Sequence, residues 1–193
     1  MPAYLDNAAT TRVCPEAARA ALEAMTEGFG NPSARYAPGQ AAAARVAEHR
    51  AAVARRLGCD PAELTFTSCG TEGDNWAIRA ALHQNRRVGR HIVTTAVEHS
   101  AVLQCLKALE REGYSVTYLK PDSQGRIAAG QVAEALREDT ALVSVMLVNN
   151  ETGARFPVEE IAALLHDRPA LLHTDAVQAF LKVPFTAASL GAD

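Results

Sequence analysis

The chain has 193 residues, of which 48% are hydrophobic and 21% charged, and its formal net charge at pH 7 is -3. This composition is typical of a globular protein and excludes a disordered or collagen-like chain. The slight acidity gives no electrostatic reason to expect nucleic-acid binding, and no apolar run of about 18 residues predicts a membrane span.

Helical and β-rich segments alternate along the chain. Apolar spacing predicts helices over residues 15–27, 40–57, 72–83, 100–112, 129–137 and 158–166. Strands are expected over residues 64–68, 91–95, 116–119, 142–148 and 170–174. The run 142–148 is apolar on both faces, which is typical of a central strand covered by helices on each side. The predicted fold class is therefore α/β, a three-layer architecture with a mostly parallel, doubly wound sheet.

The cysteines and the amino-terminal residues limit the kinds of site and the cellular location to be expected. The cysteines include no C-x-x-C pair, so neither a metal site nor a redox dithiol is expected; they are Cys14, Cys59, Cys69 and Cys105. We interpret them as buried or incidental thiols, except that helix N–H groups near Cys69 are expected to lower its pKa. Residues 1–7 have neither a basic start nor a long apolar stretch, so no signal peptide is expected and the predicted location is cytoplasmic.

Polar residues follow the predicted strands, at the sheet edge where doubly wound folds bind ligands. Gly70 and Thr71 precede a helix, so the backbone N–H groups and the Thr71 hydroxyl are expected to hold a phosphate; a plain N-cap is the alternative for Thr71. His99 follows the next strand, where its ring is suited to stack on a flat cofactor and to carry protons. A surface histidine is the alternative there, and it is our interpretation of His49, His83, His91 and His166.

Two further strands are followed by candidate ligand contacts. Asn150 comes after the most apolar strand, and its amide is placed to donate to a ligand oxygen. Asp175 follows the strand at 170–174, and a carboxylate there needs a partner that offsets its desolvation. A protonated ring nitrogen would be one, with Gln178 reaching a neighbouring ring oxygen; a core salt bridge or a helix cap is the alternative for Asp175. Together these sites predict pyridoxal 5'-phosphate as cofactor.

Six motifs occur in order along the chain: YLDNAATT at 4–11, FGNPS at 29–33, FTSCGTE at 66–72, EHSAVL at 98–103, VNNETG at 148–153 and HTDAVQ at 173–178. In these motifs the sequence resembles the amino-terminal part of cysteine desulfurases of the NifS/IscS group, class V aminotransferases within the fold-type I pyridoxal-phosphate enzymes. By that resemblance residues 1–14 would be an amino-terminal arm, and residues 15–193 an incomplete cofactor-binding large domain.

The resemblance also implies residue roles. Gly70 and Thr71 would bind the phosphate, and His99 would stack on the ring and act as the catalytic proton carrier. Asp175 would pair with the ring nitrogen. The ring hydroxyl would be contacted by Asn150 and Gln178.

The implied reaction converts L-cysteine into L-alanine and passes persulfide sulfur to iron-sulfur cluster or thio-cofactor assembly. The implied partners are L-cysteine, a sulfur-acceptor or scaffold protein and a second subunit of a homodimer, with no nucleic acid and no membrane. Another fold-type I enzyme, such as a selenocysteine lyase or an aminotransferase, is one alternative. A non-catalytic module that binds a phosphate ligand is the other.

Three departures from the family pattern stand out. Cys69 and Gly70 occupy positions where Gly-Ala is usual, and Ala34 and Tyr36 replace the commoner Ser and His. In the family, a Ser-Gly-His-Lys segment with the Schiff-base lysine, the persulfide-forming cysteine and a small domain all come after the position of Asp193. The chain is therefore expected to be truncated on its carboxyl-terminal side and inactive alone, and no cysteine of this chain matches the catalytic one.

Overall fold

The computed structural model describes residues 3–193, which divide into two compact units that meet in sequence between Thr65 and Phe66. Residues 1 and 2 of the expected arm lie outside the described residues. The arm at 1–14 and the large domain at 15–193 stay predictions.

The first unit is helical. It contains α1 (Pro15–Thr26), α2 (Ala37–Leu57) and the short 3-10 helix η1 (Pro61–Glu63). We expected α2 to begin at residue 40, but it begins at Ala37, with a proline in its first turn. The helix ends at Gly58, whose φ of 68° favours glycine. None of the residues of α1 is buried. Among the described helices, none combines the length and the apolar character needed to cross a membrane.

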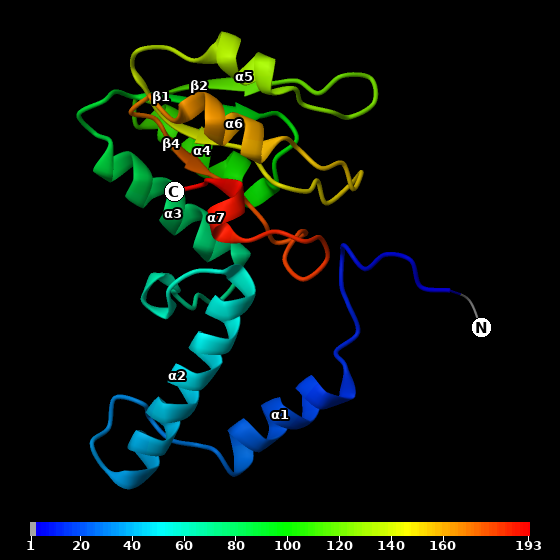
Figure 1. Ribbon diagram of the computed structural model, residues 1–193, viewed down its shortest axis with the longest axis vertical. Helices are drawn as coiled ribbons and strands as arrows, with labels where there is room; N and C mark the ends of the chain where they lie inside the picture. Colours follow the sequence, from blue (N-terminus) through cyan, green and yellow to red (C-terminus); the bar gives the residue numbers. More distant parts are fainter. Residues whose placement is uncertain (1–2) are drawn as a thin grey trace. The chain divides into compact units, whose positions relative to one another are not determined.

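The second unit is built on a parallel sheet (Figure 1). Its strands are β1 (His91–Thr95), β2 (Ser115–Leu119), β3 (Thr140–Ser144) and β4 (Leu171–His173), in the order β2-β1-β3-β4. All three strand pairs are parallel. The helices of this unit are α3 (Gly70–Gln84), α4 (Ser100–Arg111), α5 (Ala129–Ala135), α6 (Val158–Leu165) and α7 (Ala187–Leu190).

Strand residues alternate between the two faces of the sheet, and each face is covered by helices. Ile92 and Leu142 pack with buried residues of α3 and α4, whereas the neighbouring Val93 and Val143 pack with those of α5, α6 and α7. Each such buried side chain stabilises the fold by about 1.5–3 kcal/mol. The three-layer, doubly wound α/β prediction is therefore confirmed.

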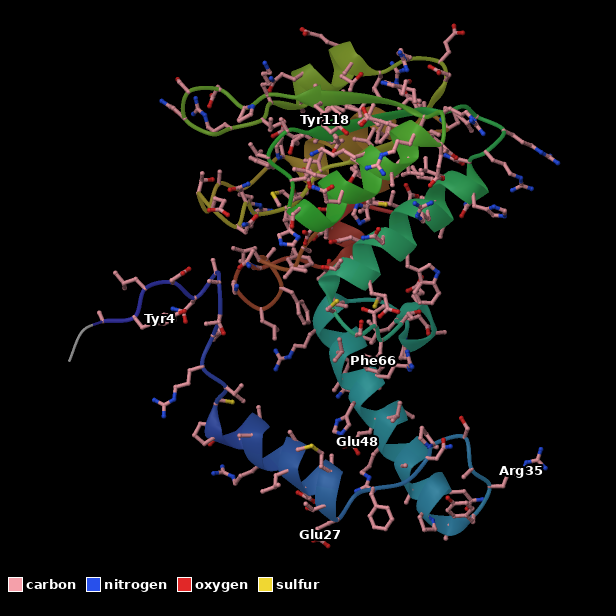
Figure 2. All side chains as sticks on the ribbon, turned by 180° about the vertical axis from the view of Figure 1, so that it is seen from behind. Tyr4, Glu27, Arg35, Glu48, Phe66 and Tyr118 are labelled. Atoms are coloured by element: carbon pink, nitrogen blue, oxygen red, sulfur yellow. The ribbon has the colours of Figure 1, made fainter. Side chains whose placement is uncertain are left out.

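The strand predicted at 64–68 is wrong. The described sheet pairs only β1 to β4, and residues 64–67 run without regular structure after η1. Phe66, which the apolar pattern placed in a strand, is 52% exposed (Figure 2). A β-rich run becomes a strand only when a neighbouring strand pairs with it, and none of the described strands does so here.

The interpretation of His91 as a surface histidine is also wrong. As the first residue of β1 it is fully buried. Its Nδ1 lies 2.8 Å from the Thr140 hydroxyl and its Nε2 2.9 Å from that of Thr117. Burial lowers the pKa of His91, because the charged ring would lose its hydration. His91 is a satisfied core residue that links three strands.

Candidate active site

A pocket of about 160 Å³ lies in the second unit, at the carboxyl ends of the strands. The chain moves from β1 to β2 on one side and then crosses to β3 on the other, so the strand order reverses beside β1. Such a reversal is where doubly wound sheets bind ligands. All six site residues predicted from the sequence line this pocket, and so does Asp74; the six are Gly70, Thr71, His99, Asn150, Asp175 and Gln178. Their roles stay predictions.

The start of α3 forms one wall of the pocket. The N-cap is Cys69, with extended backbone, and Thr71 lies inside the first turn, so the N-cap alternative for Thr71 is wrong. First-turn N–H groups have no partner within the helix, and together with the helix dipole they favour an anion. A Cβ at Gly70 would lie 2.9 Å from Cγ2 of Val177, so a larger residue would crowd this wall.

Cys69 is exposed beside this wall. The N–H of Glu72 is the largest cause of its lowered pKa, followed by the Ser68 hydroxyl. Donors of this kind stabilise the thiolate over the thiol. The expected lowering is therefore confirmed, and so is the buried character of Cys105.

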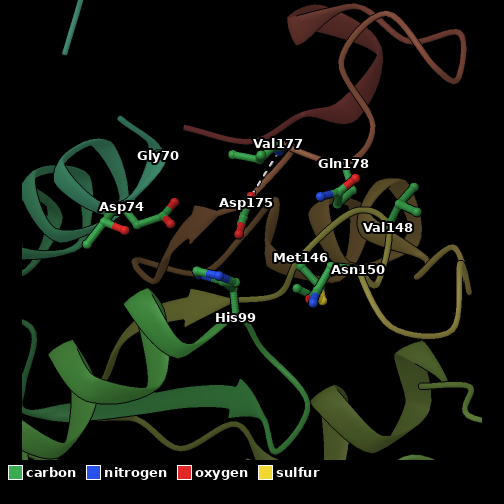
Figure 3. A pocket seen from close by; sticks show the side chains of 10 residues that line it. Gly70, Asp74, His99, Met146, Val148, Asn150, Asp175, Val177 and Gln178 are labelled. Atoms are coloured by element: carbon green, nitrogen blue, oxygen red, sulfur yellow. Dashed lines mark hydrogen bonds between the residues drawn. The ribbon is translucent and has the colours of Figure 1, made fainter. Parts of the chain in front are cut away.

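His99 is the N-cap of α4, and its Nδ1 accepts a hydrogen bond from the backbone N–H of Ala101 at 3.2 Å. A nitrogen that accepts carries no proton, so this bond requires the tautomer with the proton on Nε2. Figure 3 shows the His99 ring beside the Asp175 side chain. The sequence placed His99 at a strand-to-helix turn, and the capping bond fixes its ring there.

Asp175 is 7% exposed, and its Oδ1 accepts from the backbone N–H of Val177 at 2.9 Å. The other carboxyl oxygen points into the pocket (Figure 3), and no described residue donates to it. Burial raises the pKa of Asp175, and the nearby charge of Asp74 raises it further. Among residues 3–193 no cation within ion-pair distance meets this carboxylate, and a turn rather than a helix follows it, so neither alternative interpretation holds.

In Figure 3 Asp74 lies on one side of Asp175, and Asn150 and Gln178 lie on the other. The Lys182 ammonium donates to Oε1 of Gln178 at 2.6 Å. Nδ2 of Asn150 donates to the Glu151 carboxylate at 3.1 Å. This side of the pocket is therefore lined by two side-chain amides, a group type that suits an oxygen on a ligand.

Glu98 supports the site, a role that we did not predict. Its side chain is buried, and its Oε1 accepts from the Thr95 hydroxyl at 2.7 Å. The backbone N–H of Met146 donates to both carboxyl oxygens, at 3.0 and 3.1 Å. Glu98 thus links the turn that carries His99 to the segment after β3. Burial raises the pKa of Glu98 to about 8, so the group is largely neutral at pH 7.

Asn149 supports the site in a similar way, although the prediction singled out its neighbour Asn150. Its Nδ2 donates to the Val97 carbonyl at 2.9 Å. Its Oδ1 accepts from the backbone N–H groups of Glu151 and Thr152, at 3.0 and 2.9 Å. Asn149 therefore holds together the two loops that carry His99 and Asn150. Its position directly after a long apolar run was the available sequence signal.

Comparison with known proteins assigns this chain to a family. The family described as "Aminotransferase class-V" matches residues 3–193. "Cysteine desulfurase 2" of Trichormus variabilis is 50% identical over 181 residues, which are 94% of this chain and 45% of that protein. The chain therefore spans about half the length of the curated relatives it matches.

Solved structures agree with this assignment. A NifS-like protein superposes with a TM-score of 0.95 at 37% identity, covering 100% of this chain and 53% of that one. The structure of SspA in complex with cysteine superposes with a TM-score of 0.93 at 34% identity, covering 98% and 55%. The architecture around the pocket is thus shared with proteins of the NifS type.

Proposed function

Because this chain belongs to the aminotransferase class-V family, we propose that its pocket binds pyridoxal 5'-phosphate and that the protein containing these residues is a cysteine desulfurase. One observation carries the proposal. A helix N-terminus, an imidazole, two side-chain amides and a buried carboxylate line a single pocket. These groups match the phosphate, the aromatic face, the phenolic oxygen and the pyridine nitrogen of that cofactor.

The described residues fit the cofactor by their chemistry. The wall at Gly70 and Thr71 would hold the phosphate, because it combines first-turn N–H groups with a hydroxyl. The pocket-facing oxygen of Asp175 lacks a described donor, and a protonated ring nitrogen would supply one. Asn150 and Gln178 would contact the ring hydroxyl oxygen.

When bound, pyridoxal phosphate supplies an electron sink for negative charge that develops on a substrate carbon. Asp175 would hold the proton on the ring nitrogen, because its buried charge is stabilised by that proton. His99 would stack on the ring and move a proton at Nε2, the nitrogen left over when Nδ1 accepts from Ala101. The two residues thus divide ring activation and proton transfer.

We propose L-cysteine as substrate and L-alanine as product, with persulfide sulfur passing to a sulfur-acceptor or iron-sulfur scaffold protein. The similarity to desulfurases and to SspA in complex with cysteine supports this choice. The described residues form a pocket of about 160 Å³, smaller than the about 300–1,000 Å³ of typical ligand sites, so they supply only part of the proposed site. We also propose a homodimer, by resemblance to the desulfurases. The cytoplasmic location stays a prediction.

The cofactor proposal is tested by binding of pyridoxal phosphate to this chain, measured by equilibrium dialysis and by absorbance near the visible edge. Asp175→Ala removes a hydrogen bond to a charged group, which is worth about 1.5–3 kcal/mol, so we expect affinity to fall roughly 10- to 100-fold. Thr71→Val removes the hydroxyl proposed to bind the phosphate, so it is expected to weaken the binding of pyridoxal phosphate. Asp167→Ala, at an exposed carboxylate, serves as the control.

Equal affinity in the unchanged chain, Asp175→Ala and Thr71→Val would overturn the cofactor assignment. The substrate is tested separately in the protein that contains these residues. L-cysteine is expected to yield alanine and sulfide in the presence of a reductant. Preferential turnover of selenocysteine or of a keto acid would instead assign a selenocysteine lyase or an aminotransferase.

A further inference from the structure

His173, the last residue of β4, has a polar group near each ring nitrogen. Its Nδ1 lies 2.9 Å from the hydroxyl of Ser144, which is fully buried on β3. Its Nε2 lies 3.6 Å from the Asp74 carboxylate on α3. The side chains of His173 and Asp74 are 10% and 9% exposed. The ring is therefore fixed in orientation and directed toward a wall of the pocket.

His173 and Asp175 lie on the same face of the chain. The parallel ladder continues past β4, since the N–H of Val145 donates to the His173 carbonyl and the N–H of Leu147 to that of Asp175. In such an extended segment, residues two apart point to the same side. The imidazole is thus brought to the two carboxylates, of Asp74 and Asp175, that share the pocket.

Two buried carboxylates in one pocket repel each other, and a nearby positive charge offsets that repulsion. Burial and the Val177 N–H have the largest effects on the pKa of Asp175, and the charges around it come next. Asp74 raises the pKa of Asp175, and His173 and then His99 lower it. Glu98, in the turn after β1, is the other acidic group whose charge interacts with that of Asp175. It is largely neutral at pH 7.

We propose that Asp74 and His173 are a positioning pair for Asp175: the imidazole, oriented by the Ser144 hydroxyl and lying beside the Asp74 carboxylate, offsets in its protonated form the repulsion between the two carboxylates that share the pocket. The inference rests on the proposed function, because Asp175 is the carboxylate that we assign to the cofactor ring nitrogen. It concerns residues that act on Asp175, whatever the substrate.

The experiment is a carbon-13 NMR titration of the Asp175 carboxyl in the cofactor-free chain, with the signal assigned by its loss in Asp175→Asn. His173→Gln removes the positive charge, so the pKa of Asp175 is expected to rise by about one unit, a tenfold tighter hold on the proton. Asp74→Asn removes the repulsion, so that pKa is expected to fall. The double variant is expected to return toward the unchanged chain.

His166 and Asp167 provide a matched control, because they form the same kind of pair with side chains 84% and 97% exposed. His166→Gln and Asp167→Asn are expected to leave the Asp175 titration unchanged. An unchanged titration in both pocket variants, or a shift in the same direction in both, would overturn the proposal, since loosened packing has no reason to act with opposite signs. If circular dichroism shows His173→Gln unfolded, the sign of the shift in Asp74→Asn decides alone.

Adding pyridoxal phosphate separates this inference from the proposed function. Opposite shifts in the cofactor-free variants without any binding of the cofactor would retain the positioning pair and reject the cofactor site. Binding that depends on Asp175, together with a titration that the variants leave unmoved, would retain the cofactor site and reject the pair.

Discussion

The pKa of the Glu98 carboxyl group is determined by burial more than by its hydrogen bonds. Donors from Thr95 and Met146 favour the ionised form, yet burial is the larger effect and raises its pKa from 4.5 to about 8. The folded chain therefore binds this proton more tightly than the unfolded chain. The stability that results is fully present below pH 4.5 and is lost as the pH rises through about 8.

Glu98→Gln removes this titration while keeping the size of the side chain. Between pH 5 and pH 9 we expect the unchanged chain to lose roughly 3–5 kcal/mol more unfolding free energy than the variant does. Urea unfolding at several pH values measures the difference. Glu134→Gln, at an exposed position on α5, is the control and should follow the unchanged chain. Parallel pH profiles for Glu98→Gln and the unchanged chain would contradict the role of burial.

The loop after β3 depends on one of two adjacent asparagines. Asn149 is buried and bonds Val97, Glu151 and Thr152, whereas Asn150 is partly exposed and faces the pocket. Asn149→Ala removes three hydrogen bonds made by a buried side chain, so it is expected to lower the unfolding free energy by about 2–3 kcal/mol. Asn150→Ala is expected to cost less than about 0.5 kcal/mol and to weaken cofactor binding. Equal unfolding midpoints for the two variants would refute this division.

The elements of the second unit were largely predictable from the sequence. β1 was predicted over its full length, and the apolar run at 142–148 contains most of β3. The error at 64–68 shows the limit, because apolar alternation reports which residues form strands well and not whether another strand pairs with them. The six site residues were found because each follows a strand or begins a helix.

Other parts of the site were beyond sequence reasoning. The links made by Glu98 and by His173 join residues that lie 48 and 29 positions from their partners Met146 and Ser144. Spacing along the chain says nothing about such contacts before the fold is known. Asp74 was missed for the same reason, since a carboxylate one turn into a helix is usually exposed to solvent.

On the scale of the whole molecule, burial is uneven between the two units. The strands β1 and β3 are buried along their whole length, whereas α1 has no buried residue. A helix of 12 residues, none of them buried, gains little from packing and is only marginally stable in water. We expect backbone amides of α1 to exchange with deuterium within seconds and those of β1 and β3 to resist exchange for hours. Protection of α1 comparable to that of β1, measured by mass spectrometry, would contradict this expectation.

The spread of the pocket along the chain has a consequence for biosynthesis. Its contributors lie at 70–74, 99, 146–150 and 175–178, so a ribosome delivers the carboxylate of Asp175 and the amide of Gln178 only after the other walls have emerged. Until β4 docks beside β3, a nascent chain has the start of α3 and the His99 imidazole but lacks the carboxylate that we propose for the pyridine nitrogen. If the cofactor site is as proposed, pyridoxal phosphate is expected to bind only after β4 has joined the sheet, and not to guide the pairing of β1, β2 and β3.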